Sequence, residues 1–352
     1  MPVCLRVPKA SGQRTLRALG EMELLNRSFK VAAEEGNLLL PLVRLPSASE
    51  TARLKTLEPA MMLLDAEVPR PIARPTLLDA LSERLPPHLL AVAPRSIDHI
   101  GDIAVIEFVP ELWQHRAIVG NAILAVEKRT RTVLAKKGPV TGAFRLRDYE
   151  VVAGDGKMET VHRENGCVFY LDLSKVYFTP RLSFEHQRVA MSAKEGETVV
   201  DLFSGVGPYA IQIAKRVRDI RVYAVDLNPA AVEYLERNIL ANNVWGKVIP
   251  IEGDAREVVR QQLANSADRV IMNLPSQATL FLDAACLALK PRGGVVHHYA
   301  FATAGEPIEV VQASAVDAIR QAGRGVEAVL ATRTIRAVAP HEYLVALDLA
   351  VR

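Results

Sequence analysis

From about residue 176 to the end, apolar segments alternate with amphipathic segments of helical length. Neighbouring parallel strands need a crossover connection, which is usually a helix, so this alternation is typical of an open parallel sheet with helices on both faces. The last two apolar segments, 327–339 and 342–351, are separated only by a short turn that contains Pro340. They predict a hairpin, and therefore a mixed sheet with an antiparallel last strand.

Before residue 176, the order of strand-like and helix-like segments is different, and it predicts two smaller α+β domains. Residues 1–60 alternate strand-like and helix-like segments, and the Pro-rich, polar stretch that follows suggests a linker or boundary somewhere near 45–75. Residues 75–175 form the expected middle domain, which carries a basic run made of Lys128, Arg129, Arg131, Lys136, Lys137, Arg145 and Arg147. We therefore expect three domains, at 1–60, 75–175 and 176–352.

Composition narrows the class of protein. The 352 residues are 49% apolar, which is enough for sizeable cores, and a net charge of +3 allows a nucleic-acid partner without requiring one. Cys4, Cys167 and Cys286 are far apart and form no CxxC pair, so neither a disulfide framework nor a cysteine zinc site is expected. We expect no metal site, no signal peptide, no membrane span and a cytoplasmic location.

A glycine turn follows the first strand of the expected sheet. Gly205 and Gly207 stand just before Pro208, and a second strand ends about twenty residues later in Asp226. Glycines allow a ligand to approach the backbone closely, and an acid at that position can accept hydrogen bonds from ribose hydroxyls. The third glycine of a dinucleotide fingerprint is absent, whereas acids precede the turn at Asp201 and end the third strand at Asp254. Three acids at three strand ends resemble the arrangement of class I methyltransferases.

The fourth strand ends in Asn273-Leu274-Pro275, at the edge where open α/β sheets bind their ligands. In methyltransferases that act on exocyclic amines, an aromatic residue follows at this place, but Ser276 is not aromatic. Methyl transfer to C5 of a pyrimidine needs a cysteine nucleophile, and Cys286 falls within the next helix. Both of these target classes are therefore disfavoured.

Several longer motifs together resemble one family, the archaeal and eukaryotic type of tRNA (guanine37-N1)-methyltransferases. Residues 177–186, YFTPRLSFEH, look like its Phe-Ser-Pro-Arg-Leu signature followed by a glutamate, and 142–147, GAFRLR, look like its Gly-x-Phe/Tyr-Arg-x-Arg segment. Asn273-Leu274-Pro275 and the segment 339–343 are also similar, and the N-terminal unit resembles the extra domain of the archaeal form. The resemblance covers nearly the whole chain. It implies a Rossmann-like class I fold that uses S-adenosylmethionine.

The resemblance also implies roles for single residues. Glu185 matches the general base that removes the N1 proton of guanine, Arg145 matches the group that stabilises negative charge on O6, and Asn273 is a third catalytic candidate. The residues expected at the cofactor are Tyr177, His186, Asp201, Phe203, Gly205, Gly207, Asp226, Leu227, Asp254, Ala255, Asn273 and Pro275. The expected partner is a tRNA with guanosine at position 37, bound by a monomer through the basic middle domain and the N-terminal unit.

Two other functions stay open at this point. One is a transferase of the wybutosine pathway, which uses the same scaffold and cofactor on a tRNA that is already methylated. The other is a non-catalytic protein that senses S-adenosylmethionine and binds RNA. Loss of Glu185 or Asn273 would mark the second function, and the chain keeps both residues.

Overall fold

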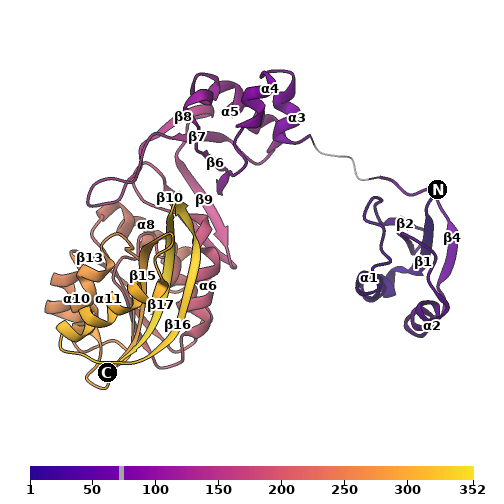
Figure 1. Ribbon diagram of the computed structural model, residues 1–352. Helices are drawn as coiled ribbons and strands as arrows, with labels where there is room; N and C mark the ends of the chain where they lie inside the picture. Colours follow the sequence, from indigo (N-terminus) through magenta and orange to yellow (C-terminus); the bar gives the residue numbers. More distant parts are fainter. Residues whose placement is uncertain (71–74) are drawn as a thin grey trace. The chain divides into compact units, whose positions relative to one another are not determined.

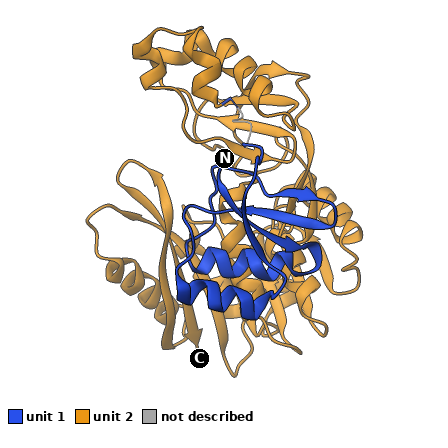
Figure 2. Cartoon of the chain, turned by 90° about the vertical axis from the view of Figure 1, so that its right-hand side faces the viewer, with its two compact units in different colours: residues 1–75 blue, residues 76–352 orange. Residues whose placement is uncertain are grey.

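The computed structural model describes residues 1–70 and 75–352 and divides the chain into two compact units, 1–75 and 76–352 (Figures 1 and 2). Unit 1 is an antiparallel sheet in the order β2-β3-β1-β4 with two helices. Its elements are β1 (Val3–Pro8), α1 (Gly12–Glu21), β2 (Ala32–Glu34), β3 (Asn37–Pro41), α2 (Ala48–Leu57) and β4 (Met62–Asp65). A core of leucines, among them Leu5, Leu19 and Leu40, lies between the sheet and the helices.

The linker or boundary expected somewhere near 45–75 cannot occupy most of that stretch, because α2 and β4 lie within it and belong to unit 1, which ends at residue 75. A capping box begins α2: Glu50 N–H donates to Ser47 Oγ at 3.3 Å and Ser47 N–H donates to the Glu50 carboxylate at 2.7 Å. This S-x-x-E spacing was visible in the sequence. Residues 71–74 of the expected linker lie outside the described residues.

Unit 2 begins with a small domain in which three helices cover a four-stranded sheet of order β5-β6-β7-β8. The helices are α3 (Leu77–Ser82), α4 (Pro87–Ala91) and α5 (Arg116–Val126), and the strands are β5 (Asp98–Ile100), β6 (Ile103–Ile106), β7 (Thr132–Lys136) and β8 (Tyr149–Gly154). Gly120 allows α5 to lie close to β8, since a Cβ there would stand 2.9 Å from the Ala153 Cβ.

The large sheet of unit 2 has the order β13-β12-β11-β14-β15-β17-β16. Its strands are β11 (Thr198–Asp201), β12 (Arg221–Asp226), β13 (Val248–Glu252), β14 (Arg269–Met272), β15 (Gly294–Thr303), β16 (Val326–Ala339) and β17 (Glu342–Val351). The first five are parallel, and β17 pairs antiparallel with both β15 and β16. The predicted mixed sheet with an antiparallel last strand is confirmed.

Helices cover both faces of the large sheet. One core contains side chains of α6 (Ser183–Ser192), α7 (Pro208–Arg216) and α8 (Pro229–Ala241), and the other contains side chains of α9 (Ala255–Val258), α10 (Leu282–Ala288) and α11 (Ile308–Gln321). Strand order reverses between β11 and β14. A crevice opens at the carboxyl ends of the strands on either side of such a reversal. In the part of the chain that is described, no helix is long and apolar enough to cross a membrane.

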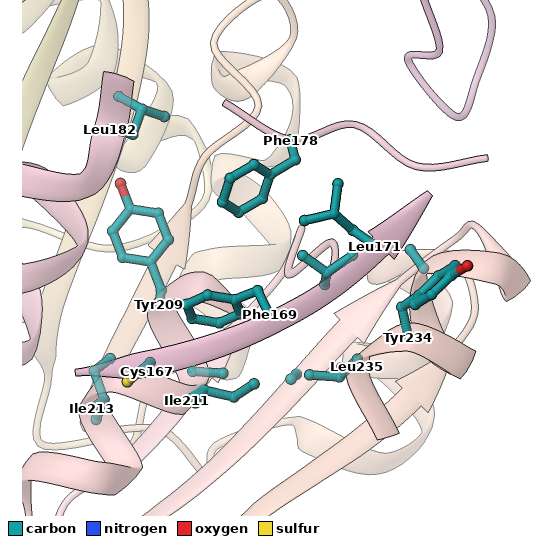
Figure 3. Close-up of a cluster of buried hydrophobic side chains, with 14 of the residues drawn as sticks. Cys167, Phe169, Leu171, Phe178, Leu182, Tyr209, Ile211, Ile213, Tyr234 and Leu235 are labelled. Carbon is teal, nitrogen blue, oxygen red and sulfur yellow. The ribbon is translucent and has the colours of Figure 1, made fainter. Parts of the chain in front are cut away.

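A hairpin of β9 (Glu159–Glu164) and β10 (Cys167–Asp172) packs on the large domain, although the expected boundary at 175/176 assigned it to the middle domain. Figure 3 shows Phe169 and Leu171 of β10 beside Tyr209 of α7 and Leu235 of α8. Asn238 of α8 and Asn242, which caps its C-terminus, bond to the backbone of β10. The reason is that the inward face of β10 is apolar and α7 and α8 offer it a matching apolar surface.

Replacing Phe169 by alanine should lower the free energy of unfolding by about 3–5 kcal/mol, because it removes a fully buried ring and leaves a cavity. Urea unfolding followed by circular dichroism measures the change. Trp245→Ala is the matched control, since Trp245 is 72% exposed and its loss should change stability by less than about 0.5 kcal/mol. Equal midpoints for the two variants would contradict the role of β10 in this core.

Candidate functional site

A cavity of about 550 Å³ lies at the carboxyl ends of β11, β12, β13 and β14. Its wall combines the segments that follow these four strands with the loop 140–147 and with residues from 177–186 and β16. Eleven of the expected site residues line it: Arg145, Tyr177, His186, Phe203, Gly205, Asp226, Leu227, Asp254, Ala255, Asn273 and Pro275. Segments far apart in sequence therefore meet at the crevice that the strand order creates.

Asp226 ties the glycine turn to the end of the neighbouring strand. Its carboxylate accepts from Gly205 N–H at 2.6 Å and from Asn228 N–H at 2.9 Å. Burial raises the pKa of Asp226, while these backbone donors act in the opposite direction. A carboxylate has about four acceptor positions, so Asp226 keeps free lone pairs for the two hydroxyls of a ribose.

The wall beside Asp226 is mostly apolar. Phe203 meets Phe281 edge to face with ring centroids 5.0 Å apart, and Leu227 and Ala255 lie in the same wall. Asp254 accepts from the N–H groups of Arg256 and Glu257 at 2.9 and 3.4 Å, so it caps α9 while it lines the cavity. This slot suits a flat, partly apolar ring such as adenine.

The His186 ring is hydrogen-bonded to the carboxylate of Glu164. Its Nδ1 lies 2.7 Å from Glu164 Oε1, which also accepts from Gln212 Nε2 at 2.7 Å. Burial raises the pKa of Glu164, but the hydrogen bonds from His162 and His186 outweigh burial and lower it to about 2. Because an ionised carboxylate can only accept, Nδ1 carries the proton in this pair. The sequence offers no signal for Glu164, which belongs to β9.

Arg145 stands at the tip of a tight turn in which Thr141 and Leu146 exchange backbone hydrogen bonds. Its φ of 54° is left-handed, a conformation that costs a non-glycine residue about 1 kcal/mol or more. Nη1 donates to Ser276 Oγ at 2.5 Å, next to Asn273 and Pro275 in the wall. Burial lowers the pKa of Arg145. The strained turn thus aims a partly desolvated guanidinium at the segment after β14.

Glu185 does not line the cavity but lies directly behind its wall, between the lining residues Leu182 and His186. It is 1% exposed, and its Oε2 accepts from Arg188 Nε at 2.9 Å and from Tyr299 Oη at 3.1 Å. The other oxygen, Oε1, is buried and accepts no hydrogen bond from any described residue. One carboxylate oxygen is therefore fixed by hydrogen bonds, whereas the other has only a long ion-pair contact, with Arg333 Nε at 4.0 Å.

Arg188 connects Glu185 to a buried network of polar side chains. Arg188 also donates to both oxygens of Asp348 at 2.5 and 3.2 Å, and Asp348 bonds to His297 Nδ1 at 2.6 Å. The prediction from sequence missed these residues. A signal was present, because His297 and Asp348 are polar residues within otherwise apolar strands, and buried polar groups need partners.

Asp201 and Gly207, both expected at the cofactor, are not in the wall. Asp201 is fully buried, and burial raises its pKa to about 8. Gly207 has a φ of 89°, and a Cβ there would lie 2.4 Å from Leu235 Cδ1. Gly207 therefore lets α7 begin close to α8, and contact of either residue with a cofactor stays a prediction.

Replacing Asp226 by alanine should weaken binding of S-adenosylmethionine about 10- to 100-fold, because a charged acceptor of the ribose hydroxyls is lost. The change also leaves Gly205 N–H without its acceptor. Isothermal titration measures the affinity. Asp219→Ala is the control, since Asp219 is an exposed acid just before the opposite end of β12. Unchanged affinity in Asp226→Ala would refute the ribose contact.

Acids at the ends of β12 and β13, an apolar slot between them and an antiparallel strand in an otherwise parallel sheet define a class I methyltransferase that uses S-adenosylmethionine. Asp226, Phe203, Leu227 and Ala255 line the cavity, so a bound S-adenosylmethionine would find an acceptor for its ribose and an apolar surface for its adenine there. The chain belongs to the TRM5/TYW2 methyltransferase family, whose methyltransferase domain matches residues 160–326. The TYW2 N-terminal domain matches 77–157 and the tRNA methyltransferase 5 N-terminal domain matches 4–50.

Relatives of known name match the chain over its full length. The tRNA (guanine(37)-N(1))-methyltransferase Trm5b of Pyrococcus abyssi is 38% identical over 100% of this chain and 99% of the relative. The crystal structure of that protein superposes with a TM-score of 0.71, and the complex of aTrm5 with tRNALeu, 31% identical, covers 100% of both chains with a TM-score of 0.68. The tRNA 4-demethylwyosine(37)-methyltransferase Taw21 of Saccharolobus solfataricus is 34% identical over 72% of this chain and 93% of the relative.

Proposed function

We propose that this protein transfers the methyl group of S-adenosylmethionine to N1 of guanosine 37 in tRNA. The relatives that match its whole length carry the name of this activity. Within the site, the strongest support is the hydrogen bond of Arg145 to Ser276, which joins a guanidinium from the middle domain to the wall that holds Asn273. Such a group suits an acceptor that gains negative charge during the reaction.

The chemistry begins with a proton. N1 of guanine carries a hydrogen and becomes a good nucleophile only when that hydrogen leaves, so a base is required. Glu185, which lies behind the cavity wall, would take it with Oε1, which no described residue donates a hydrogen bond to, while Arg188 and Tyr299 hold Oε2. Negative charge then develops on O6 of the base, and Arg145 stabilises it.

Two further roles complete the proposal. Asn273 bonds to the edge of the guanine through its side-chain amide and keeps N1 in line with the methyl group. Bound S-adenosylmethionine would supply the electrophilic methyl group: as N1 bonds to the methyl carbon, the bond from that carbon to sulfur breaks and S-adenosylhomocysteine leaves with the electron pair. The remaining residues exclude water and orient the base: Tyr177 and Phe178 form a wall of the same cavity.

Most contacts with the tRNA would lie outside the cavity. The protein would bind it as a monomer. The target base must leave its stack, which costs a few kcal/mol. Lysines and arginines of the middle domain, among them Lys137 and Arg131, neutralise phosphates, and the N-terminal unit adds contacts elsewhere on the tRNA.

A methyl-transfer assay tests the proposal directly. Unmodified tRNA transcripts with guanosine or adenosine at position 37 are incubated with the enzyme and S-adenosylmethionine, and nucleosides are identified by mass spectrometry. We expect N1-methylguanosine from the guanosine transcript only. Absence of product from both transcripts, with cofactor binding intact, would reject guanosine N1 as the target.

A second candidate function has its own support. The middle segment matches the TYW2 N-terminal domain, and a relative at 34% identity is named for a methyltransferase of 4-demethylwyosine. The same assay with tRNA that already carries 4-demethylwyosine at position 37 tests it. A methylated product from that tRNA but not from the plain transcript would make the second function the correct one.

A further inference from the structure

A second cavity, of about 880 Å³, adjoins the first. The two cavities share six wall residues: Arg147, Tyr177, Phe178, Thr179, Arg336 and Val338. Most of the remaining wall comes from the middle domain, chiefly from β5, β6, β7, the segment 107–113 and the start of β8, and Pro180 and Arg181 complete it. We refer to this space as the flanking cavity. No step of the proposed reaction uses it.

The charge of the flanking cavity is strongly positive. Five cations and two carboxylates line it, so its wall alone carries as much net charge as the whole chain, +3. The carboxylates are already engaged: Asp98 bonds to Arg181 Nε at 2.5 Å, and Lys136 Nζ lies 3.6 Å from Asp98 and 3.4 Å from Glu107. The positive charge that is left therefore belongs mainly to Lys137, Arg147 and Arg336.

Arg336 is the arginine of this wall with the weakest hydrogen bonding to described residues. It is half-buried on β16, and its Nε is buried without a hydrogen-bond acceptor among the described residues. Its Nη1 reaches only the carbonyl of Ala337, at 3.5 Å. Burial lowers the pKa of Arg336, and the neighbouring Tyr177 opposes this change. A guanidinium that burial partly desolvates and that has no carboxylate bonded to it is costly inside a protein, and a phosphate that binds its more exposed Nη atoms would offset this cost.

Aromatic side chains form another part of the same wall. Phe108 and Trp113 are half-buried and meet edge to face, with ring centroids 6.1 Å apart, and Tyr149 and Tyr177 also line the cavity. Burial raises the pKa of Tyr149 to about 12, so its ring is neutral. Aromatic rings beside unpaired cations are the usual means of holding an unstacked base and its phosphate in single-stranded nucleic acid.

We propose that the flanking cavity binds the nucleotide next to the target guanosine, with its phosphate at Arg336 and its base against the aromatic wall. The proposal rests on the proposed function, because it needs a target nucleotide in the first cavity. Consecutive nucleotides are joined by one phosphate. Tyr177 and Arg336 belong to the walls of both cavities, so a phosphate at Arg336 could link a nucleotide in one cavity to its neighbour in the other. Holding the neighbour out of the stack would offset part of the cost of extruding the target.

The test on the RNA side changes no protein residue. Transcripts with an abasic nucleotide immediately 5′ or 3′ of the target are compared with the intact transcript for binding to the wild-type enzyme. Stacking on protein aromatics predicts that one of the two abasic transcripts binds about 5- to 150-fold more weakly. The transcript that loses affinity identifies the neighbour. Equal affinity of all three transcripts would overturn the proposal.

The test on the protein side removes one charge. Arg336→Gln should bind the intact transcript about tenfold more weakly, and the slope of log Kd against log salt concentration should fall by about 0.7, the value for one phosphate contact on a single strand. Arg218→Gln is the matched control, since Arg218 is exposed in the loop between α7 and β12. Equal affinities and slopes for the two variants would remove Arg336 from phosphate binding.

The flanking cavity and the proposed function are tested by different measurements. Methylation of the intact transcript by wild-type enzyme tests the function, whereas the binding comparisons do not depend on product. Methylation together with equal binding of all transcripts would overturn the flanking site alone. Loss of affinity for one abasic transcript without methylation would uphold the site and reject the function.

Discussion

Arg145→Ala is expected to lower the single-turnover rate of methyl transfer to guanosine 37 by about 10²–10³, the usual loss for one donor to a developing oxyanion. The guanidinium is half-buried and is aimed by a turn that keeps Arg145 at a φ of 54°. Water that replaces it would be neutral and unaligned, so charge on O6 would be poorly stabilised. Rapid-quench kinetics at saturating tRNA and cofactor measures the rate.

Two comparisons separate this role from a merely structural one. Binding of S-adenosylmethionine to Arg145→Ala should be unchanged, because the residues that we assign to its ribose and adenine come from other segments of the cavity wall. Ser276→Ala removes only the acceptor that orients the guanidinium, 2.5 Å from Nη1, and should cost less than removal of the arginine itself. A near-normal single-turnover rate for Arg145→Ala would exclude Arg145 from O6.

Glu185→Gln is expected to lower the same rate by about 10²–10⁴ at neutral pH, because an amide cannot accept the N1 proton. Glutamine keeps the shape, and its carbonyl oxygen still accepts from Arg188 and Tyr299. Arg188 also keeps its pair with Asp348, so no uncompensated charge is created. The rate of this variant should rise with pH, since solvent hydroxide then removes the proton that the carboxylate no longer takes.

The control for Glu185→Gln is the same change at an exposed position. Glu159 on β9 pairs with Arg237 at 2.7 Å and is half exposed, so Glu159→Gln should leave both rate and stability almost unchanged. Near-wild-type single-turnover rates for Glu185→Gln at neutral pH would show that another group, or water, removes the proton.

Much of the large domain could be predicted from the sequence because its signals are local. Alternating apolar and amphipathic segments gave the order of strands and helices, and strand ends were marked by Asp226, Asp254 and Asn273. All carboxyl ends of parallel strands meet at one edge, so these three residues were expected together, and they line one cavity. The sequence was less informative where the signal was nonlocal or was not used, as at the hairpin β9–β10, which packs on the large domain, and at the capping box of α2.

The contacts that support the site were not predictable, because they join segments that are distant in sequence. Arg145 and Ser276 are 131 residues apart, and Tyr299 and Glu185 are 114 apart. A glutamate in the first turn of a helix is normally exposed, but α6 packs so that Glu185 is buried against β15. His186 depends in the same way on Glu164 from the hairpin.

The sequence by itself therefore determined the type of sheet, the antiparallel last strand and the edge at which the cavity opens, since periodicity and chain connection decide these. Only the tertiary structure decided which side chains enter the cavity and which lie behind its wall. Asp201, Gly207 and Glu185 lie outside the wall, whereas Phe281 and Arg336 lie in it. The physical reason is that the direction of a side chain depends on what packs against its element, and that partner comes from elsewhere in the chain.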